Sequence, residues 1–367
     1  MNKKLIIYTL VSFVIVGCAA KNIVEPKLDS KGDLVKVFNL EDEKFTKFIT
    51  KKKSTSEKLD DKIVGSPLEK AQKKRKTVKK KKNKKKNKKK TKAEKVSTKK
   101  EEVKIVEKVV PPQEREDYPK AYLDYNKYEK YWKMYRPITR PGEKIALEIS
   151  WTLFKAGVAT IETLGDLEIG GEEVVGYRAS LESAKYFENI YKLRDVLDTY
   201  ISKESHIPVK YVLKQRESGQ SVDDLQLFDR ENLKTYFWYN RLKKGKTKKT
   251  EKEAYTPKYF MDSFSAIQFV RGLPLKVGSK FEFPVITRTK VWIFSAKVDG
   301  IEEIDYLGKD IKAFKIKAET HYPGVLKKKG DILFWVSADK RRIPLKLEAK
   351  IKIGTVKGKL INYESGK

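Results

Sequence analysis

Alternation of apolar and polar residues over the last two thirds of the chain limits its possible folds more than any other feature. Residues 345–353 read LKLEAKIKI, and residues 144–154 read KIALEISWTLF. Successive side chains of a strand point to opposite faces, so such runs have one apolar face and one polar face. Similar runs recur at 158–164, 174–183, 193–202, 207–216, 224–229, 234–241, 280–286, 291–298, 311–319, 331–337 and 355–363. We predict about thirteen strands, many joined by short polar turns.

These strands predict an all-β domain over residues 137–367. One large antiparallel sheet would curl into a barrel-like or sandwich domain and so hide its edges. One helix interrupts the strands at 262–272, where Asp262-Ser263 can cap the start and Gly272 can end it. We expect this helix to plug one end of the sheet, and a second short turn at 187–191 to lie over another rim.

A dense aromatic segment, residues 114–136, precedes the domain. Tyr118, Tyr122, Tyr125 and Trp132 recur at the spacing of one helix face. Such a stripe could bind sugars or a membrane interface. Packing against the adjacent domain is the favoured interpretation.

The N-terminus has the pattern of an export signal over residues 1–17. Asn2-Lys3-Lys4 is a positive start, and the apolar run 5–16 is shorter than the roughly 20 residues that a membrane span needs. The run ends in Ile15-Val16-Gly17-Cys18, which resembles the lipobox of bacterial lipoproteins. The resemblance implies cleavage before Cys18 and acylation of its thiol, for example by palmitate. The alternative is an ordinary signal peptide with an incidental cysteine, but Cys18 is the only cysteine in the chain.

Residues 18–113 are predicted to be a disordered, Lys-rich tether, because their composition cannot bury enough apolar surface to fold. The net charge of +33 is concentrated here, since residues 70–100 hold 19 Lys and Arg against Glu94 alone. Its centre is the possible polyanion-binding set Lys79, Lys80, Lys81, Lys82, Lys84, Lys85, Lys86, Lys88, Lys89 and Lys90. Anionic lipids or envelope polymers would suit these lysines. A solvated spacer without a partner is equally compatible with the run, whereas nucleic acid is disfavoured behind an export signal.

Residues for a catalytic or metal site are scarce. His206 and His321 have no His or Cys neighbour at ligand spacing, so we predict no metal site and no cofactor. Gly245-Lys246-Thr247 copies the end of a phosphate loop, but Asn240 stands where its first glycine belongs. We interpret this motif as a polar hairpin loop.

Charged pairs in the domain have a structural interpretation as well as a functional one. Asp223-Asp224 and Glu302-Glu303 could serve a glycosidase, but we expect both pairs to face solvent on turns. Arg341-Arg342 beside Asp339 could clamp an anion, although a tight turn with charged flanks is favoured. The sequence therefore predicts no enzyme.

The folded part resembles the bacterial domain-of-unknown-function family 3108 (DUF3108). The resemblance begins at Pro141-Gly142-Glu143 and continues through 149–151 and 156–159. It includes Tyr191-Lys192-Leu193-Arg194-Asp195, 228–232, 262–284 and 327–363, with Asp339 to Pro344 at its centre. The resemblance implies an exported, β-rich protein and no known activity.

Together these features predict a membrane-anchored envelope lipoprotein with a non-enzymatic β-rich binding or interaction domain. A curled sheet lined by apolar residues could hold an apolar or lipid-like ligand in a cavity near the 262–272 helix. The alternative is a structural envelope protein that docks a partner while its basic tail binds polyanions, and a hydrolase ranks third. Ala19, rather than Asp, follows the lipidated position, which favours the outer membrane, facing the periplasm.

Overall fold

The computed structural model describes residues 32–52, 110–189, 191–321, 329–351 and 354–367. Apart from Val110, these residues belong to one compact unit made of 1–53 and 111–367. Cys18 and the ten lysines between 79 and 90 lie outside the described residues.

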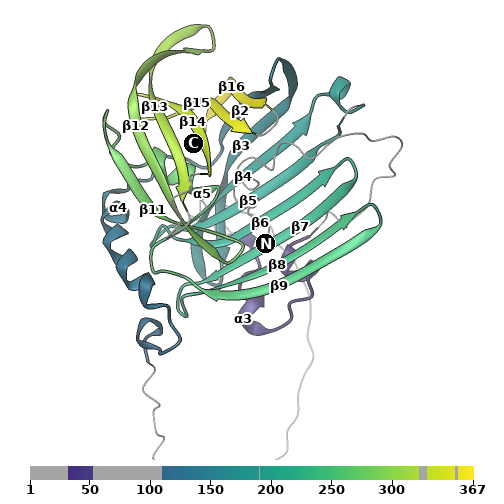
Figure 1. Cartoon of the computed structure of the whole chain (residues 1–367), viewed down its shortest axis with the longest axis vertical. Coiled ribbons are helices and arrows are strands. Elements are labelled where there is room, and N and C mark those ends of the chain that lie inside the picture. The colour runs from purple at the N-terminus through teal and green to yellow at the C-terminus, as the bar shows by residue number, and fades with distance from the viewer. Residues whose placement is uncertain (1–31, 53–109, 190, 322–328, 352–353) are drawn as a thin grey trace, which may run out of the picture. The chain divides into compact units, whose positions relative to one another are not determined.

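One curled sheet dominates this unit (Figure 1). Its strands are β2 Glu143–Trp151, β3 Phe154–Ile169, β4 Glu172–Ser183, β5 Arg194–Ser202, β6 Pro208–Glu217, β7 Gln220–Asp229, β8 Lys234–Lys243, β9 Lys246–Tyr255, β10 Met261–Asp262, β11 Lys280–Thr287, β12 Lys290–Tyr306, β13 Lys309–His321, β14 Lys329–Ser337, β15 Pro344–Ile351 and β16 Gly354–Ser365. A two-residue strand, β1 Lys51–Lys52, pairs with β3 outside the main order.

The order in the sheet runs from β10 through β11 to β16, continues with β2 to β8, and ends at β9. Among the described strands only β10 and β11 pair in parallel. No pairing joins β9 to β10 in the described part of the chain, so the sheet is barrel-like and not closed. The predicted all-β fold with a large antiparallel curled sheet is confirmed.

The inner face of the sheet is filled by aromatic and aliphatic side chains. The predicted helix is present as α5 Ser265–Arg271, and the carboxylate of Asp262 accepts the amide protons of Phe264 and Ser265 at its start. Phe269 stacks on Tyr135 and contacts Phe283 edge-on, with ring centroids 4.7 and 5.2 Å apart. The helix therefore lies inside the curl, buried on almost every side.

The aromatic segment packs against the domain, as the sequence favoured. It consists of the 3₁₀ turns η1 Pro112–Glu114 and η2 Lys120–Tyr128, followed by α4 Glu129–Met134. Tyr118 and Trp132 are buried, and the hydroxyl of Tyr118 donates to the carbonyl of Thr256 at 3.0 Å. A further 3₁₀ turn, η3 Lys185–Phe187, lies close to the rim turn predicted at 187–191.

The predicted tether is wrong for residues 32–52. This N-terminal segment forms α2 Leu34–Val37, α3 Glu43–Thr46 and β1, and Figure 1 shows it against the β6–β9 part of the sheet. Leu34, Val35 and Phe48 are buried there with Leu225 and Trp238. The average composition of the predicted tether is too polar to fold, but residues 32–52 are richer in apolar side chains and can bury enough surface to fold.

Candidate functional site

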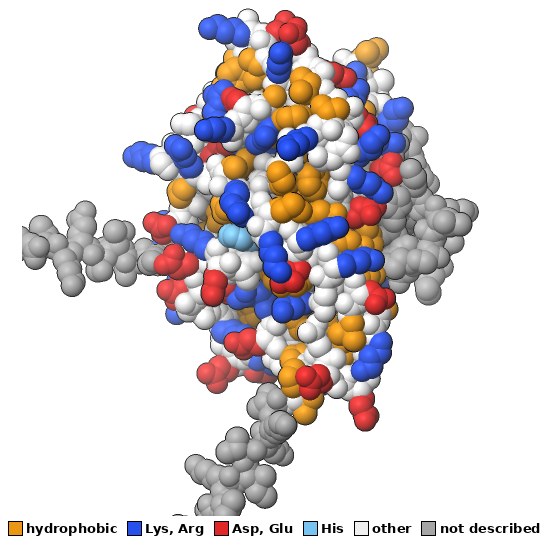
Figure 2. Space-filling view, turned by 90° about the vertical axis from the view of Figure 1, so that its left-hand side faces the viewer, with side chains coloured by type: hydrophobic (Ala, Val, Ile, Leu, Met, Phe, Trp, Pro, Cys, Tyr) orange, Lys and Arg blue, Asp and Glu red, His pale blue; other side chains and the backbone are white. Residues whose placement is uncertain are grey.

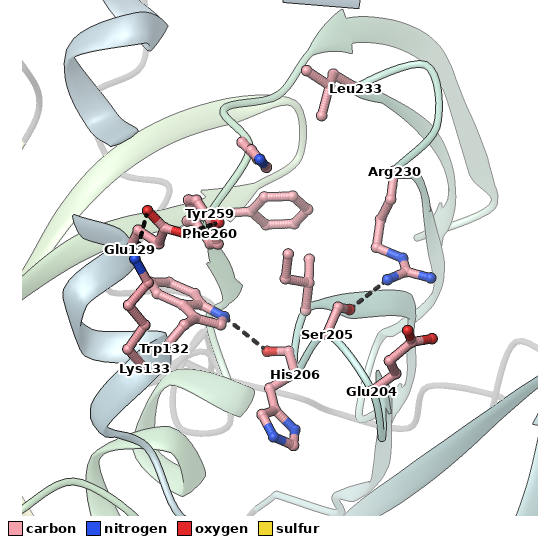
Figure 3. Close-up of a pocket in the computed structure, with 12 residues that line it drawn as sticks. Glu129, Trp132, Lys133, Glu204, Ser205, His206, Arg230, Leu233, Tyr259 and Phe260 are labelled. Atoms are coloured by element: carbon pink, nitrogen blue, oxygen red, sulfur yellow. Dashed lines mark hydrogen bonds and ion pairs between the residues drawn. The ribbon is translucent and has the colours of Figure 1, made fainter. Parts of the chain in front are cut away.

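A pocket of about 420 Å³ opens between α4 and three loops of the sheet (Figure 3). The loops are the β5–β6 connection, the β7–β8 turn and residues 256–260, which link β9 to β10. The lining residues are Glu129, Trp132, Lys133, Glu204, Ser205, His206, Ile207, Arg230, Leu233, Lys258, Tyr259 and Phe260. The sequence prediction put an apolar cavity near residues 262–272. None of the lining residues of this pocket belongs to that helix, although Trp132 also contacts Phe269 of α5. One part of the pocket wall is apolar and another part is charged.

The apolar wall is rigid because its side chains belong to the core. The indole of Trp132 donates to the carbonyl of His206 at 3.1 Å and packs against Phe269, with ring centroids 4.7 Å apart. Phe260 is buried against Phe228. A ligand would therefore meet a preformed apolar surface.

The charged wall carries three cations and two carboxylates, namely Lys133, Arg230, Lys258, Glu129 and Glu204. Lys133 lies 3.3 Å from the Glu129 carboxylate, which also accepts the Tyr259 hydroxyl at 2.8 Å. Burial and this hydrogen bond to Glu129 raise the pKa of Tyr259 to about 12, so the phenol stays protonated. Lys258 lies over the Tyr259 ring, 5.5 Å from its centroid. The ammonium groups of Lys133 and Lys258 lie at the rim of the pocket, where they could bind an anion.

Arg230 closes the opposite side of the pocket. Its guanidinium bridges the Ser205 hydroxyl and the Glu172 carboxylate. His206 packs its ring edge-on against Tyr135, 4.9 Å between centroids, and burial lowers its pKa. The imidazole is therefore neutral at pH 7. The arrangement suits binding of a small molecule with an apolar body and an acidic group.

Figure 2 shows one face of the molecule, on which lysine and arginine side chains are spread among hydrophobic ones. On the described part of this face, no large area carries side-chain charge of one sign only. Basic charge that could steer a polyanion is instead concentrated in residues 70–100, outside the described residues.

The prediction that two acidic pairs lie on turns is wrong, and the predicted solvent exposure is wrong for Asp223 and Asp224. Asp223 and Asp224 lie within β7, each 1% exposed, and pair with Arg216 at 2.7 Å and Arg288 at 2.8 Å. Glu302 and Glu303 lie in β12, where the Glu302 side chain is 41% exposed and Glu303 is exposed. The Glu302 carboxylate binds the Lys315 ammonium at 2.7 Å. Arg288 is 64 residues from Asp224, so neighbouring residues cannot reveal that partner. Arg216 and Lys315 lie 7 and 13 residues from their carboxylates, on the other strand of the same hairpin.

Two other predicted motifs form turns. Asp339 accepts the amide of Arg341 at 3.0 Å, and Arg342 has a φ of 50°, which confirms the tight turn at 339–342. Gly245, with a φ of 72°, turns β8 into β9. Lys246 and Thr247, predicted as part of a polar hairpin loop, are the first residues of β9 instead.

Within the described ranges, no helix is long and apolar enough to cross a membrane. The same ranges contain no cluster of three or more His, Cys, Asp or Glu side chains placed to hold a metal ion.

No curated protein matches the chain. A β-barrel-like protein of domain of unknown function DUF1849 from Brucella abortus is 10% identical, covering 62% of this chain and 98% of its own, with a TM-score of 0.41. The hypothetical protein CT021 from Chlamydia trachomatis is 13% identical, covering 62% and 88%, with a TM-score of 0.26. The model of a protein family of unknown function matches residues 147–361, more than half of the chain, and the chain therefore belongs to the DUF3108 family.

Proposed function

We propose that this protein is a membrane-anchored envelope lipoprotein whose β domain is a non-enzymatic binding module. The pocket between α4 and residues 256–260 is the observation that carries the binding role. Its volume suits a small ligand, since pockets for such molecules usually measure about 300–1,000 Å³. Trp132, Ile207 and Phe260 would contact an apolar body, and Lys133 and Lys258 an anionic group.

The anchor would hold the domain closer to the membrane than a 95-residue tether implies. The described fold begins at Gly32, which is 14 positions after Cys18. Fully extended, that linker spans at most about 50 Å. The proposed localisation is the outer membrane, facing the periplasm.

Native mass spectrometry of protein extracted from its own membrane tests the pocket. We expect a bound small molecule that Lys258→Glu reduces at least tenfold, because the rim would lose a cation and gain an anion. Lys276→Glu is the matched control, since Lys276 is also exposed but lies outside the pocket. Ligand-free protein in the unaltered chain and in both variants would contradict the binding role. An equal loss of bound ligand in the two variants would contradict it as well.

A second candidate function follows from the charge run at 70–100. In this alternative the domain docks an envelope partner while the lysines bind anionic polymers or lipids. Such binding weakens with salt, because mobile ions screen exposed charges. Retention of envelope polymers by the full chain should fall steeply between 0.05 and 0.5 M salt, on the order of tenfold or more. Retention that is independent of salt would contradict this alternative.

A further inference from the structure

Three large apolar side chains project together into solvent at one end of the sheet. Leu153, Phe154 and Tyr186 are 90%, 65% and 61% exposed. We call these three residues the apolar tip. Singly exposed apolar side chains are common on soluble proteins, but a contiguous group usually marks a contact surface.

Backbone hydrogen bonds hold the apolar tip in shape. The Tyr186 hydroxyl donates to the carbonyl of Lys155 at 2.5 Å, and the amide of Ala184 donates to the carbonyl of Ala156 at 2.9 Å. Thr152 adopts a φ of 56° at the β2–β3 turn, and its amide donates to Thr355 on β16. Three segments distant in the sequence thus converge at the apolar tip.

Basic side chains surround the apolar tip. Lys155 and Arg194 are 68% and 57% exposed at their side chains. The other exposed basic residues of this end are Lys185, Lys350 and Lys357. The acidic residues beside them are Glu148 and Glu188, which pair with Lys155 and Arg194, the exposed Glu182, and Glu348, which lies opposite Lys357 in the strand register. These five basic and four acidic residues leave a small excess of basic charge. A projecting Leu, Phe and Tyr within a basic rim complements an anionic lipid surface, where aromatic rings favour the headgroup layer and lysines attract the lipids.

We propose that the apolar tip inserts into the interfacial layer of an anionic membrane. This contact goes beyond the proposed function, because it uses neither the pocket nor the lipid on Cys18. A partner protein with a complementary groove is the competing occupant, and the projecting shape with its basic rim favours the bilayer over it.

The position of the tip agrees with an anchored chain. The Lys214 ammonium donates to the carbonyl of Gly32, where the described chain begins. The strand register places Lys214 level with Val196, Ser180 and Thr160. Thr160 is six residues from Phe154, or about 20 Å along β3, and three strand spacings add about 14 Å sideways. A linker that reaches about 50 Å lets Cys18 and the tip meet the same bilayer.

A fluorophore at the tip tests this insertion in the full chain. With Cys18→Ser, the variants Leu153→Cys and Leu307→Cys each carry one cysteine for a nitrobenzoxadiazole label. Leu307 is the matched control, because it is an apolar residue that is 49% exposed in another hairpin turn, between β12 and β13. Vesicles contain phosphatidylglycerol and phosphatidylcholine, with or without brominated acyl chains.

We expect at least a threefold rise in fluorescence at position 153, quenched by brominated lipid, and little change at 307. Adding Lys155→Glu and Lys185→Glu should cut the response at 153 severalfold, while circular dichroism reports an intact fold. Equal responses at the two positions would overturn the proposal, even if the N-terminal segment brings the chain to the vesicle. A response at 153 to lipid-free envelope protein, but none to vesicles, would assign the tip to a protein partner.

Discussion

Lys210 is the residue that ties the N-terminal segment to the sheet. It is 1% exposed, and its ammonium lies 2.6 Å from both carboxylate oxygens of Asp33 and 2.9 Å from the carbonyl of Phe48. Burial alone would raise the pKa of Asp33, but the Lys210 charge and hydrogen bonds outweigh burial and lower it. Without Asp33, the buried ammonium would lose its counter-ion.

Asp33→Ala should therefore lower the free energy of unfolding far more than loss of a helix cap. Removing one partner of a buried ion pair costs about 3–5 kcal/mol, and we expect about 3 because Asp33 is partly exposed. Asp42→Ala is the matched control, since Asp33 and Asp42 each cap a short helix but only Asp33 binds Lys210. A lost cap costs about 1 kcal/mol. Urea unfolding at pH 7 measures both, and equal losses would contradict this role of Lys210.

A buried carboxyl pair makes stability depend on pH. The Gln215 amide bridges Asp195 and Glu217 at 3.1 and 3.2 Å. Burial, and for Asp195 also the Glu217 charge, raises the pKa of both carboxyls. The folded state thus holds protons that the unfolded state releases near pH 4. The contribution to stability is complete below about pH 4 and is lost as pH rises through the folded pKa values.

Asp195→Asn should stabilise the protein by about 1 kcal/mol or more at pH 8, because a tenfold change in a protonation equilibrium corresponds to about 1.4 kcal/mol. It should also flatten the fall of stability between pH 4 and 8. Urea unfolding across this range is the measurement. Asp310→Asn, at an exposed carboxylate, is the control. An unchanged pH profile in Asp195→Asn would show that this pair does not set the dependence.

The residues that follow α4 pack closely against the end of α5. The amide of Arg136, just after α4, donates to the carbonyl of Gly272 at 3.0 Å. A Cβ on Gly272 would stand 2.3 Å from the Tyr135 ring and 2.5 Å from the carbonyl oxygen of Arg136. This close approach explains the glycine, although its φ of −85° suits any residue.

Gly272→Ala should destabilise the fold by about 1–3 kcal/mol, the usual cost of overpacking a core. Gly300→Ala is the control, because a Cβ there meets nothing within 4 Å. Thermal unfolding should show a clear drop in Tm for Gly272→Ala and a small change for Gly300→Ala. Similar Tm values would contradict the close packing of α5.

Elements with apolar–polar alternation could be predicted from the sequence, and elements without it could not. β15 and β16 follow the pattern, and α5 has its capping residues. β9 reads KTKKTEKEAY and has no apolar face, so alternation does not reveal it. As the last strand of the sheet it needs none, and its charges discourage pairing with another chain.

The whole molecule differs from the predicted arrangement because the N-terminal segment returns to the sheet. Trypsin should cut the Lys-rich residues 70–100 first, since exposed basic segments are preferred cleavage sites. Residues 32–52 should then stay bound to 111–367 through their buried contacts, and both fragments should elute together in size-exclusion chromatography. Asp33→Ala should weaken that association, whereas release of the N-terminal fragment from the unaltered chain would contradict docking.

The pocket could not be predicted from the sequence. Its residues come from four separate segments, and no short motif joins Trp132 to Arg230 or Lys258. Arg271–Glu143 and Arg288–Asp224 are likewise ion pairs between residues 128 and 64 positions apart. Only the curl of the sheet brings such residues together. The density of aromatic residues around Trp132 is the sequence feature that points to this region, and it correctly predicts that the segment packs against the domain.

The proposed place of this protein in the cell envelope requires a mature chain that begins at an acylated Cys18. Intact-mass measurement of the native protein, recovered from membrane and soluble fractions, tests this claim directly. We predict a membrane-fraction chain that lacks residues 1–17 and carries the added mass of acyl groups on its first residue. An uncut, unacylated chain in the soluble fraction would contradict the account.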